Sequence, residues 1–257
     1  MARAHPRRVP LMPTSTETKG SDIRATTRLA GGLVLDVSVS IAGRSAAGFE
    51  RGSGECVDSF VLPDSSVALA IWDASGHGAA AASNTLLTRA AFRTLLPGNG
   101  DLNETIKALN RLLCFRASGE TPGPLVRGFF AHVDPERRTL RYVSCEHDAV
   151  ILFDADGTHA HLVGNAPSLG NSVSSMFEAI ELSLQAGQVL ITATRGIADA
   201  RPSGATTDVF GVGRICSSFR PRMTDASADA AWLMDEAASF SGGMLTDDAA
   251  VCIARFG

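Results

Sequence analysis

The first regular hydrophobic pattern lies at residues 32–40, where GLVLDVSVS alternates apolar and polar side chains. Alternation with a period of two is typical of a β-strand that buries one face. Two more strand-like runs, at residues 58–62 and 66–72, are joined by Pro63-Asp64-Ser65, which are residue types of a tight turn. These runs predict a β-hairpin that follows the first strand.

After residue 78 the pattern becomes helical. Leu87, Ala91 and Leu95 fall on one face of a predicted helix, and Pro97-Gly98 predicts its end. The sequence Asp-Leu-Asn-Glu at 101–104 has the form of a capping box and predicts a second helix that continues to about residue 117.

The rest of the chain predicts mostly strands. They are expected at residues 127–133, 139–145, 149–153, 159–163, 179–184, 188–194 and 249–254, with helices at 211–219 and 227–240. Consecutive hairpins with helices grouped in pairs indicate an α+β fold of antiparallel sheets covered by helices. We expect one domain at residues 23–257, preceded by a flexible tail at 1–22.

Composition narrows the function classes. The chain has 257 residues, 45% of them hydrophobic, and a net charge of -4. Without clustered Lys and Arg, nothing favours binding to nucleic acid or to an anionic membrane. The apolar window at 29–41 is interrupted by Asp36 and is too short to span a bilayer. Five widely spaced cysteines without a CxxC pair indicate reduced thiols, so a cytoplasmic protein is expected.

The sequence IWDASGHG at 71–78 is the first candidate for chemistry. Asp73 ends an apolar strand, so a rigid element would present its carboxylate, and the glycines would let the backbone approach an ion or ligand. Alternatively, Asp73 and Ser75 cap the helix that begins near residue 78. Both interpretations stay open from this motif alone.

Other acidic residues are expected near Asp73. Glu55 and Asp58 flank the start of the hairpin strand that pairs with the Asp73 strand, and Asp247 and Asp248 open the last strand. Carboxylates gathered at strand ends are how Mg²⁺ or Mn²⁺ is held. Each residue alone is typical of a solvated turn, so a metal site requires that several converge.

The segment 53–82, SGECVDSFVLPDSSVALAIWDASGHGAAAA, resembles the opening signature of the SpoIIE/RsbU-type serine phosphatases. These form the bacterial branch of the metal-dependent (PPM) protein phosphatases. The resemblance continues through LNRLL at 109–113, the hairpin at 129–157, APSLG at 166–170, LQAGQVLITATRGIADAR at 184–201 and TDDAAVCIARF at 246–256. It implies a four-layer αββα sandwich of two antiparallel sheets flanked by helices, and a centre of two Mn²⁺ or Mg²⁺ ions whose bridging water attacks phosphoserine or phosphothreonine.

The resemblance also implies roles for individual residues. Asp73 matches the aspartate that bridges both metals, and the carbonyl of Ala74 matches the backbone ligand beside it. Glu55 takes the place of the aspartate in the motif Gly-Gly-Asp, and Asp247 matches the carboxyl-terminal ligand, so these three acids are the predicted catalytic and metal-binding residues. A structural role or a supporting position near the metals is implied for Asp58, and a supporting position for Asp248.

One position departs from the family pattern. Where the family has Thr-Asp-Gly with a metal-ligand aspartate, this chain has Thr194-Arg195-Gly196. At an effective dielectric of 20, unit charges 4 Å apart interact by about 4 kcal/mol, and a divalent ion roughly doubles that. One metal site is therefore expected to be weak or absent unless Arg195 swings outward. Alternatively, its guanidinium replaces the cation and binds phosphate directly.

The histidines and one glycine pair suggest no further site. His77 and His147 lie within family motifs and are predicted to be structural. His159 and His161 alternate along a strand without a nearby Cys or acid cluster, so zinc is not expected. Gly211-Val-Gly213 does not follow a strand into a βαβ unit, so it does not predict a dinucleotide loop.

The resemblance implies a protein serine/threonine phosphatase that acts on a phosphorylated regulatory protein, of the anti-sigma-factor antagonist type found in partner switching. The alternative is a degenerate phosphatase that binds a phosphoprotein without turnover, because Arg195 replaces a ligand. A homodimer stays open. With only a short tail before the fold, control is expected through expression, a separate partner or oligomerisation.

Overall fold

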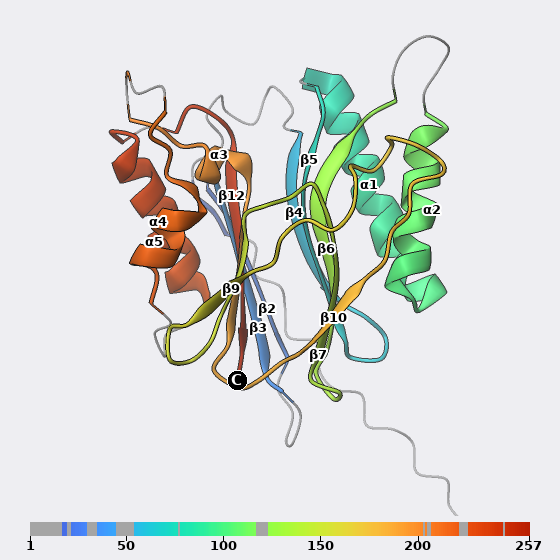
Figure 1. The fold of residues 1–257 in the computed structure, drawn as a ribbon, viewed down its shortest axis with the longest axis horizontal. Helices are drawn as coiled ribbons and strands as arrows, with labels where there is room; N and C mark the ends of the chain where they lie inside the picture. The colour runs from blue at the N-terminus through green and yellow to red at the C-terminus, as the bar shows by residue number, and fades with distance from the viewer. Residues whose placement is uncertain are drawn as a thin grey trace, which may run out of the picture.

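The structure is a computed structural model that describes residues 17–19, 22–29, 35–44, 54–76, 78–116, 123–202, 204, 207–220, 226–243 and 245–257. Two antiparallel sheets stack against each other, and helices cover both outer faces (Figure 1). The predicted α+β fold, a four-layer αββα sandwich, is therefore confirmed.

The larger sheet has seven strands in the order β1-β2-β3-β12-β11-β8-β9. They are β1 (Glu17–Lys19), β2 (Asp22–Leu29), β3 (Val37–Arg44), β12 (Ala249–Phe256), β11 (Val189–Ala193), β8 (Val150–Phe153) and β9 (His159–His161). The last strand of the chain, β12, thus lies in the middle of the sheet, between β3 and β11.

The smaller sheet has five strands in the order β10-β7-β6-β5-β4. They are β10 (Ile180–Ser183), β7 (Thr139–Cys145), β6 (Val126–Asp134), β5 (Val67–Ala74) and β4 (Glu55–Val61). The predicted hairpin is present as β4 and β5, with Val61 opposite Val67 across the turn at 62–66.

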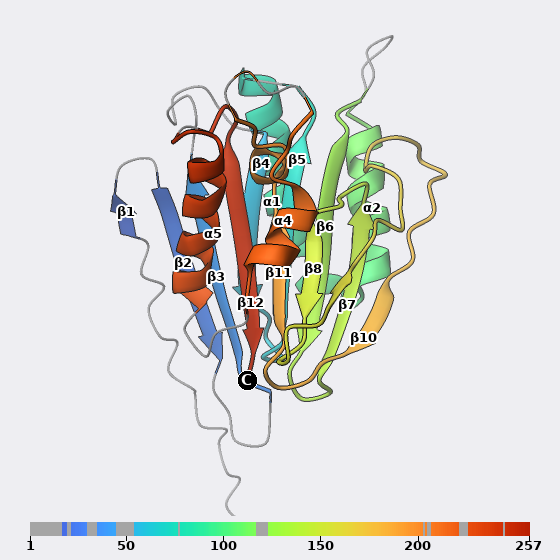
Figure 2. The ribbon, with the colours of Figure 1, turned by 60° about the vertical axis from the view of Figure 1, so that its left-hand side comes forward.

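Two long helices, α1 (Gly78–Asn99) and α2 (Leu102–Cys114), cover the outer face of the smaller sheet. On the other side, α4 (Gly211–Ser218) and α5 (Ala226–Phe240) lie across the outer face of the larger sheet (Figure 2). Asp101 caps α2 as the capping box predicts, because its side chain accepts a hydrogen bond from the backbone N–H of Glu104. A one-turn helix, α3 (Arg195–Ala198), follows β11.

Several predicted boundaries need correction. Residues 17–19 and 22, within the predicted tail at 1–22, pair in β1 and β2, so the described part of that segment belongs to the sheet. The first helix runs through Pro97 to Asn99, and the second ends at Cys114 rather than near residue 117. The strands β1 and β2 and the helix α3 were not predicted.

The apolar side chains form three separate cores, one between each pair of adjacent layers. Strand β5 contributes to two of them, because successive side chains of a strand point to opposite faces. Leu69 and Ile71 pack between the two sheets, whereas Ala70 and Trp72 pack against the helices α1 and α2. This alternation explains why β5 is apolar at nearly every position, and it directs Asp73 toward the space between the sheets.

Among the helices in the described ranges, none is long and apolar enough to cross a lipid bilayer.

Candidate metal centre at the end of the inter-sheet core

Glu55 and Asp73 lie directly opposite each other at the open end of the β4–β5 hairpin. Asp73 is also opposite Arg127 on β6, whose Nη2 donates to Asp73 Oδ2 at 3.2 Å. The three side chains share the face that carries Ile71 and Phe129, which belong to the core between the sheets. Two carboxylates and a guanidinium therefore close one end of that core.

Asp58 lies on the other face of β4, because it is three positions after Glu55 and successive side chains of a strand point to opposite faces. Its side chain is only 2% exposed. Nε and Nη2 of Arg93 each donate to its carboxylate at 2.6 Å, and Nη2 of Arg89 donates at 3.3 Å. Asp58 thus fastens α1 to the smaller sheet and points away from Glu55.

The opposite sheet reaches Glu55 through the segment that joins β11 to α3. The Thr194 side chain and the Gly196 backbone N–H both hydrogen-bond the Glu55 carboxylate. Thr194 Oγ1 in turn accepts a hydrogen bond from the Ala250 N–H of β12 at 2.9 Å. Glu55 therefore links the two sheets at the end where α3 and the tops of β4 and β5 lie (Figure 1).

Gly196 is required by a close backbone approach. A Cβ at this position would lie 1.9 Å from the carbonyl oxygen of Asp248, a distance that no side chain can occupy. The contact holds α3 against the segment before β12 and so brings Asp247 to the same end of the molecule. Asp247 is exposed, and its Oδ1 accepts a hydrogen bond from the Asp248 N–H at 2.9 Å.

The carboxylates are close enough to influence one another. The pKa of Glu55 is raised to about 8, chiefly by burial. The negative charges of Asp247 and Asp73 contribute in the same direction, whereas hydrogen bonding from Thr194 and Gly196 lowers the pKa. The three acids predicted to bind metal therefore share one electrostatic environment, although they come from both sheets.

Arg195 lies at the edge of this environment and turns outward. Its side chain is 55% exposed, and Nε donates to Oδ2 of Asp199, one helical turn later, at 3.1 Å. That hydrogen bond raises the pKa of the guanidinium, and the charges of Asp73 and Asp247 contribute in the same direction. Arg195 thus feels the acidic cluster while it pairs with Asp199.

The carbonyl of Ala74 lies beside Gly54. The Ala74 N–H donates to the Gly54 carbonyl at 2.9 Å, and Thr85 Oγ1 of α1 donates to the same oxygen at 2.7 Å. A Cβ at Gly54 would lie 2.5 Å from the Ala74 oxygen, so only glycine allows this contact. The backbone on both sides of the Glu55–Asp73 pair is therefore tightly fixed.

The donors available here are all oxygens: the carboxylates of Glu55, Asp73 and Asp247, and the carbonyl of Ala74. This set matches the ligands that Mg²⁺ and Mn²⁺ prefer. Within the part of the chain that the structure describes, no three His, Cys, Asp or Glu side chains already form a group that could hold a metal ion. The chemistry thus fits a divalent cation, but binding requires the carboxylates to draw together.

His5 and His77 lie outside the described residues. His147 is buried, its Nε2 lies 3.2 Å from Oγ1 of Thr192, and burial lowers its pKa to about 4. His159 and His161 lie on the exposed strand β9.

Sequence reasoning assigned no role to Arg127, Thr194, Gly196 or Asp199, all of which contact the acidic cluster or Arg195. The position of Arg127 could have been inferred from the sequence. It starts the predicted strand that follows the Asp73 strand in an antiparallel sheet, and this pairing places Arg127 next to Asp73. Thr194 and Gly196 come from the other sheet, and no local pattern predicts that contact.

A sequence profile described as Stage II sporulation protein E (SpoIIE) matches residues 63–257, which is most of the chain. The chain belongs to the SpoIIE family. The matched region contains Asp73, Arg195 and Asp247, whereas Glu55 and Asp58 precede it. The predicted SpoIIE/RsbU-type membership of the PPM phosphatases is thereby confirmed.

One curated relative of this SpoIIE-family chain is the protein IcfG of Synechocystis sp., which is 26% identical over 191 residues. The match covers 65% of this chain but only 30% of IcfG, so the chain spans less than a third of that relative.

Solved structures share the SpoIIE-family fold of this chain. The SiaA-PP2C domain of Pseudomonas aeruginosa aligns with a TM-score of 0.72 and 20% identity over 85% of this chain and 86% of that one. A structure of the RsbU and RsbW domains of Rv1364c from Mycobacterium tuberculosis aligns with a TM-score of 0.69 and 19% sequence identity, over 87% of this chain and 60% of that one. RsbX in complex with magnesium aligns with a TM-score of 0.65 and 12% sequence identity, over 90% of this chain and 100% of that one. The fold is therefore that of PP2C-type phosphatases.

Proposed function

We propose that this protein is a divalent-metal-dependent phosphatase that hydrolyses phosphoserine or phosphothreonine on a regulatory protein. The observation that carries the proposal is the pairing of Glu55 with Asp73 across β4 and β5, in electrostatic contact with Asp247 from the other sheet. In a chain of the SpoIIE family, carboxylates so placed are suited to hold Mn²⁺ or Mg²⁺, with the Ala74 carbonyl as a fourth donor. The magnesium in the RsbX structure supports this choice of cofactor.

A divalent cation, when bound, lowers the pKa of water and neutralises charge on phosphoryl oxygens. The chain's own residues orient the ligands. Arg127 fixes the Asp73 carboxylate through the 3.2 Å contact, and Thr194 and Gly196 fix Glu55.

The outward position of Arg195 favours a working enzyme over a degenerate one. Its hydrogen bond to Asp199 keeps the guanidinium from filling the space among the carboxylates. A salt bridge this exposed contributes only about 0 to 1 kcal/mol, so Arg195 is free to leave it and bind a phosphoryl oxygen. Under this proposal, the metal site is weakened, and the positively charged guanidinium of Arg195 assists phosphate binding.

The proposed substrate is a phosphorylated regulator of the anti-sigma-factor antagonist type. Two observations support a protein partner: membership of the SpoIIE family, and the presence of RsbU and RsbW domains together in a structure of similar fold.

The second candidate is a pseudophosphatase that binds a phosphoprotein without turnover. It is favoured by Arg195, which stands where the family has a ligand, and by the lack of a ready-made three-ligand group among the described side chains. In that case phosphate would be held by the guanidinium alone.

The experiment that separates the two is Mn²⁺-dependent hydrolysis of a phosphoserine peptide and of an aryl phosphate. If the protein is an enzyme, we expect the wild type to be active and Asp73→Asn to be inactive. The control Asp235→Asn, which changes an exposed aspartate on α5, is expected to keep the activity. A silent wild type that gains activity in Arg195→Asp supports the pseudophosphatase instead. If wild type, Asp73→Asn and Arg195→Asp are all inactive and bind neither Mn²⁺ nor phosphopeptide, both functions are rejected.

A further inference from the structure

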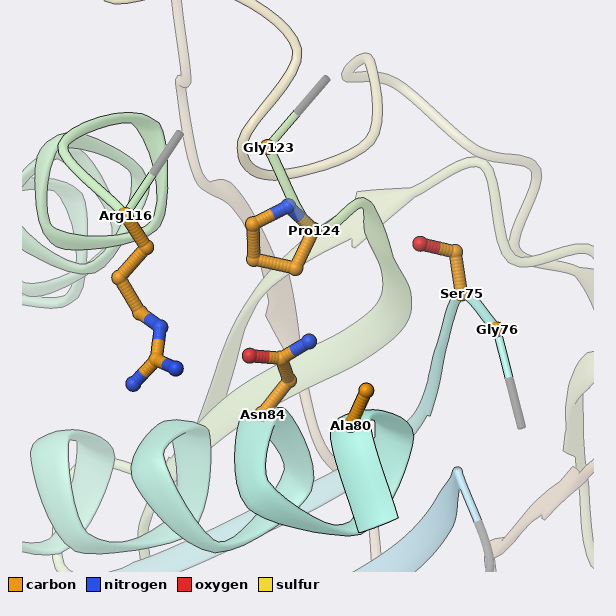
Figure 3. A pocket seen from close by; sticks show the side chains of 7 residues that line it. All are labelled: Ser75, Gly76, Ala80, Asn84, Arg116, Gly123 and Pro124. Carbon is orange, nitrogen blue, oxygen red and sulfur yellow. The ribbon is translucent and has the colours of Figure 1, made fainter. Parts of the chain in front are cut away.

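A cavity of about 300 Å³ opens beside the candidate metal centre (Figure 3). Its lining comes from the end of β5, the first turns of α1, the end of α2 and the start of β6: Ser75, Gly76, Ala80, Asn84, Arg116, Gly123 and Pro124. Ser75 is two residues after Asp73, so their Cα atoms are at most about 7 Å apart. The cavity therefore lies within a few residues' length of the carboxylate cluster.

Asn84 is the buried polar residue of the cavity. It is only 9% exposed, and Figure 3 shows its carboxamide directed into the cavity. The side chain makes no hydrogen bond to any residue in the described ranges. Because the carboxamide is directed into the cavity, its amide group is placed to donate a hydrogen bond to a ligand there. The next residue, Thr85, bonds the Gly54 carbonyl and so fixes this turn of α1 against the start of β4.

Arg116 supplies the charge. Arg116 is exposed, its side chain extends toward α1 in Figure 3, and none of the ion pairs among the described residues involves it. Ser75 adds a third donor: its Oγ already accepts a hydrogen bond from the Leu125 N–H at 3.0 Å, which leaves the hydroxyl proton to donate. A guanidinium, an amide and a hydroxyl that converge on one cavity suit an anion.

The apolar part of the lining distinguishes between anions. Ala80 and Pro124 form walls between the polar groups (Figure 3). A bare inorganic ion gains nothing from these walls, whereas the methylene groups of an acidic side chain pack against them.

We propose that this cavity binds the carboxylate of a Glu or Asp side chain that lies near the phosphorylated residue in the substrate protein. The subsite rests on the proposed phosphatase function, because it selects the substrate of the same centre. Arg116 holds the carboxylate, and Asn84 and Ser75 complete its hydrogen bonds. The protein thus prefers phosphorylated residues with an acidic neighbour.

The test uses phosphoserine peptides of one backbone sequence, in which Glu or Gln is placed in turn at each of three positions on either side of the phosphoserine. With Mn²⁺, the wild type is expected to prefer Glu over Gln by about fivefold or more in kcat/KM at one or two positions. The preference disappears in Arg116→Gln and weakens in Asn84→Leu. Arg111→Gln, an exposed arginine earlier on α2 that does not line the cavity, keeps the wild-type preference.

Equal rates for Glu and Gln peptides at all positions overturn the subsite, as does a preference that survives in Arg116→Gln. If the wild type hydrolyses no peptide and no aryl phosphate, the phosphatase function fails separately. The subsite is then tested by fluorescence anisotropy with the same Glu and Gln peptides in unphosphorylated form. Tighter binding of a Glu peptide that is lost in Arg116→Gln supports it, and equal binding of both peptides rejects it.

Discussion

Glu55 and Asp73 are paired directly across β4 and β5, so two carboxylates occupy neighbouring positions on the face that looks into the core between the sheets. Acidic residues placed side by side repel each other and are destabilising. The pair persists because Arg127 binds Asp73, and because burial raises the pKa of Glu55 to about 8, so that this group is largely uncharged at neutral pH. We interpret this arrangement as a cation site.

Restoring a carboxylate at position 195 is expected to strengthen metal binding. Arg195→Asp removes a positive charge beside Asp73 and Asp247 and adds an oxygen ligand. Because the position is half exposed, solvent reduces the electrostatic gain, and we expect Mn²⁺ to bind roughly ten- to a hundredfold more tightly. Isothermal titration calorimetry measures this, with Arg137→Asp at the exposed hairpin tip as the control. Unchanged affinity in Arg195→Asp would place position 195 outside the site.

The close contact between Gly196 and Asp248 predicts that Gly196→Ala is strongly unfavourable. The added methyl group would meet the Asp248 carbonyl oxygen, so α3 must move away from β12. We expect a loss of about 2 kcal/mol or more in the free energy of unfolding, measured by urea denaturation, together with loss of Mn²⁺-dependent activity.

Gly213→Ala is the matched control for this substitution. Gly213 lies in α4, and nothing stands within 4 Å of the added Cβ. In a helix, alanine is favoured over glycine by up to about 1 kcal/mol, so this variant should be as stable as the wild type or more so. Equal stability of the two variants would contradict the packing argument.

Asp58 is expected to act on stability more than on metal binding. Asp58→Asn leaves Arg93 with a neutral partner in place of a buried carboxylate that accepts two hydrogen bonds of 2.6 Å. We expect the free energy of unfolding to fall by about 2 kcal/mol, and the Kd for Mn²⁺ to change by less than about threefold. The opposite result, a large increase in Kd with unchanged stability, would make Asp58 a ligand.

The lowered pKa of His147 leads us to expect that the stability of the protein depends on pH. Its folded-state pKa of about 4 lies below the usual 6.5, because burial disfavours the charged imidazole. The unfolded chain therefore takes up the proton first, so the stabilising contribution is complete above pH 6.5 and is lost as the pH falls from there to about 4. The loss amounts to about 3 kcal/mol. Urea denaturation of the wild type and His147→Gln measures it, and parallel pH curves for the two proteins would refute it.

The local elements and the hairpin pairing could be predicted from the sequence. Asp64 lies midway between Glu55 and Asp73, so the turn at Pro63-Asp64-Ser65 already places the two acids opposite each other. The alternation of side chains along a strand also separates Glu55 from Asp58, to which the family resemblance had already given different roles. The relative positions of residues within one hairpin therefore follow from the local sequence pattern.

The contacts between the sheets could not be predicted in the same way. Thr194 and Gly196 are more than a hundred residues from Glu55, and they meet it only because the two sheets pack together. The helix α3 has only four residues, too few for a helical pattern to show, so the i,i+4 pairing of Arg195 with Asp199 was missed. Strands β1 and β2 were also missed.

The most direct test of the metal site is a Mn²⁺ titration followed by electron paramagnetic resonance, since the signal of free Mn²⁺ falls as the ion binds. The wild type is expected to bind Mn²⁺ and Asp73→Asn to lose that binding, while Asp235→Asn binds as the wild type does. If Asp73→Asn binds Mn²⁺ as tightly as the wild type, the carboxylates at the end of the inter-sheet core are not a metal centre.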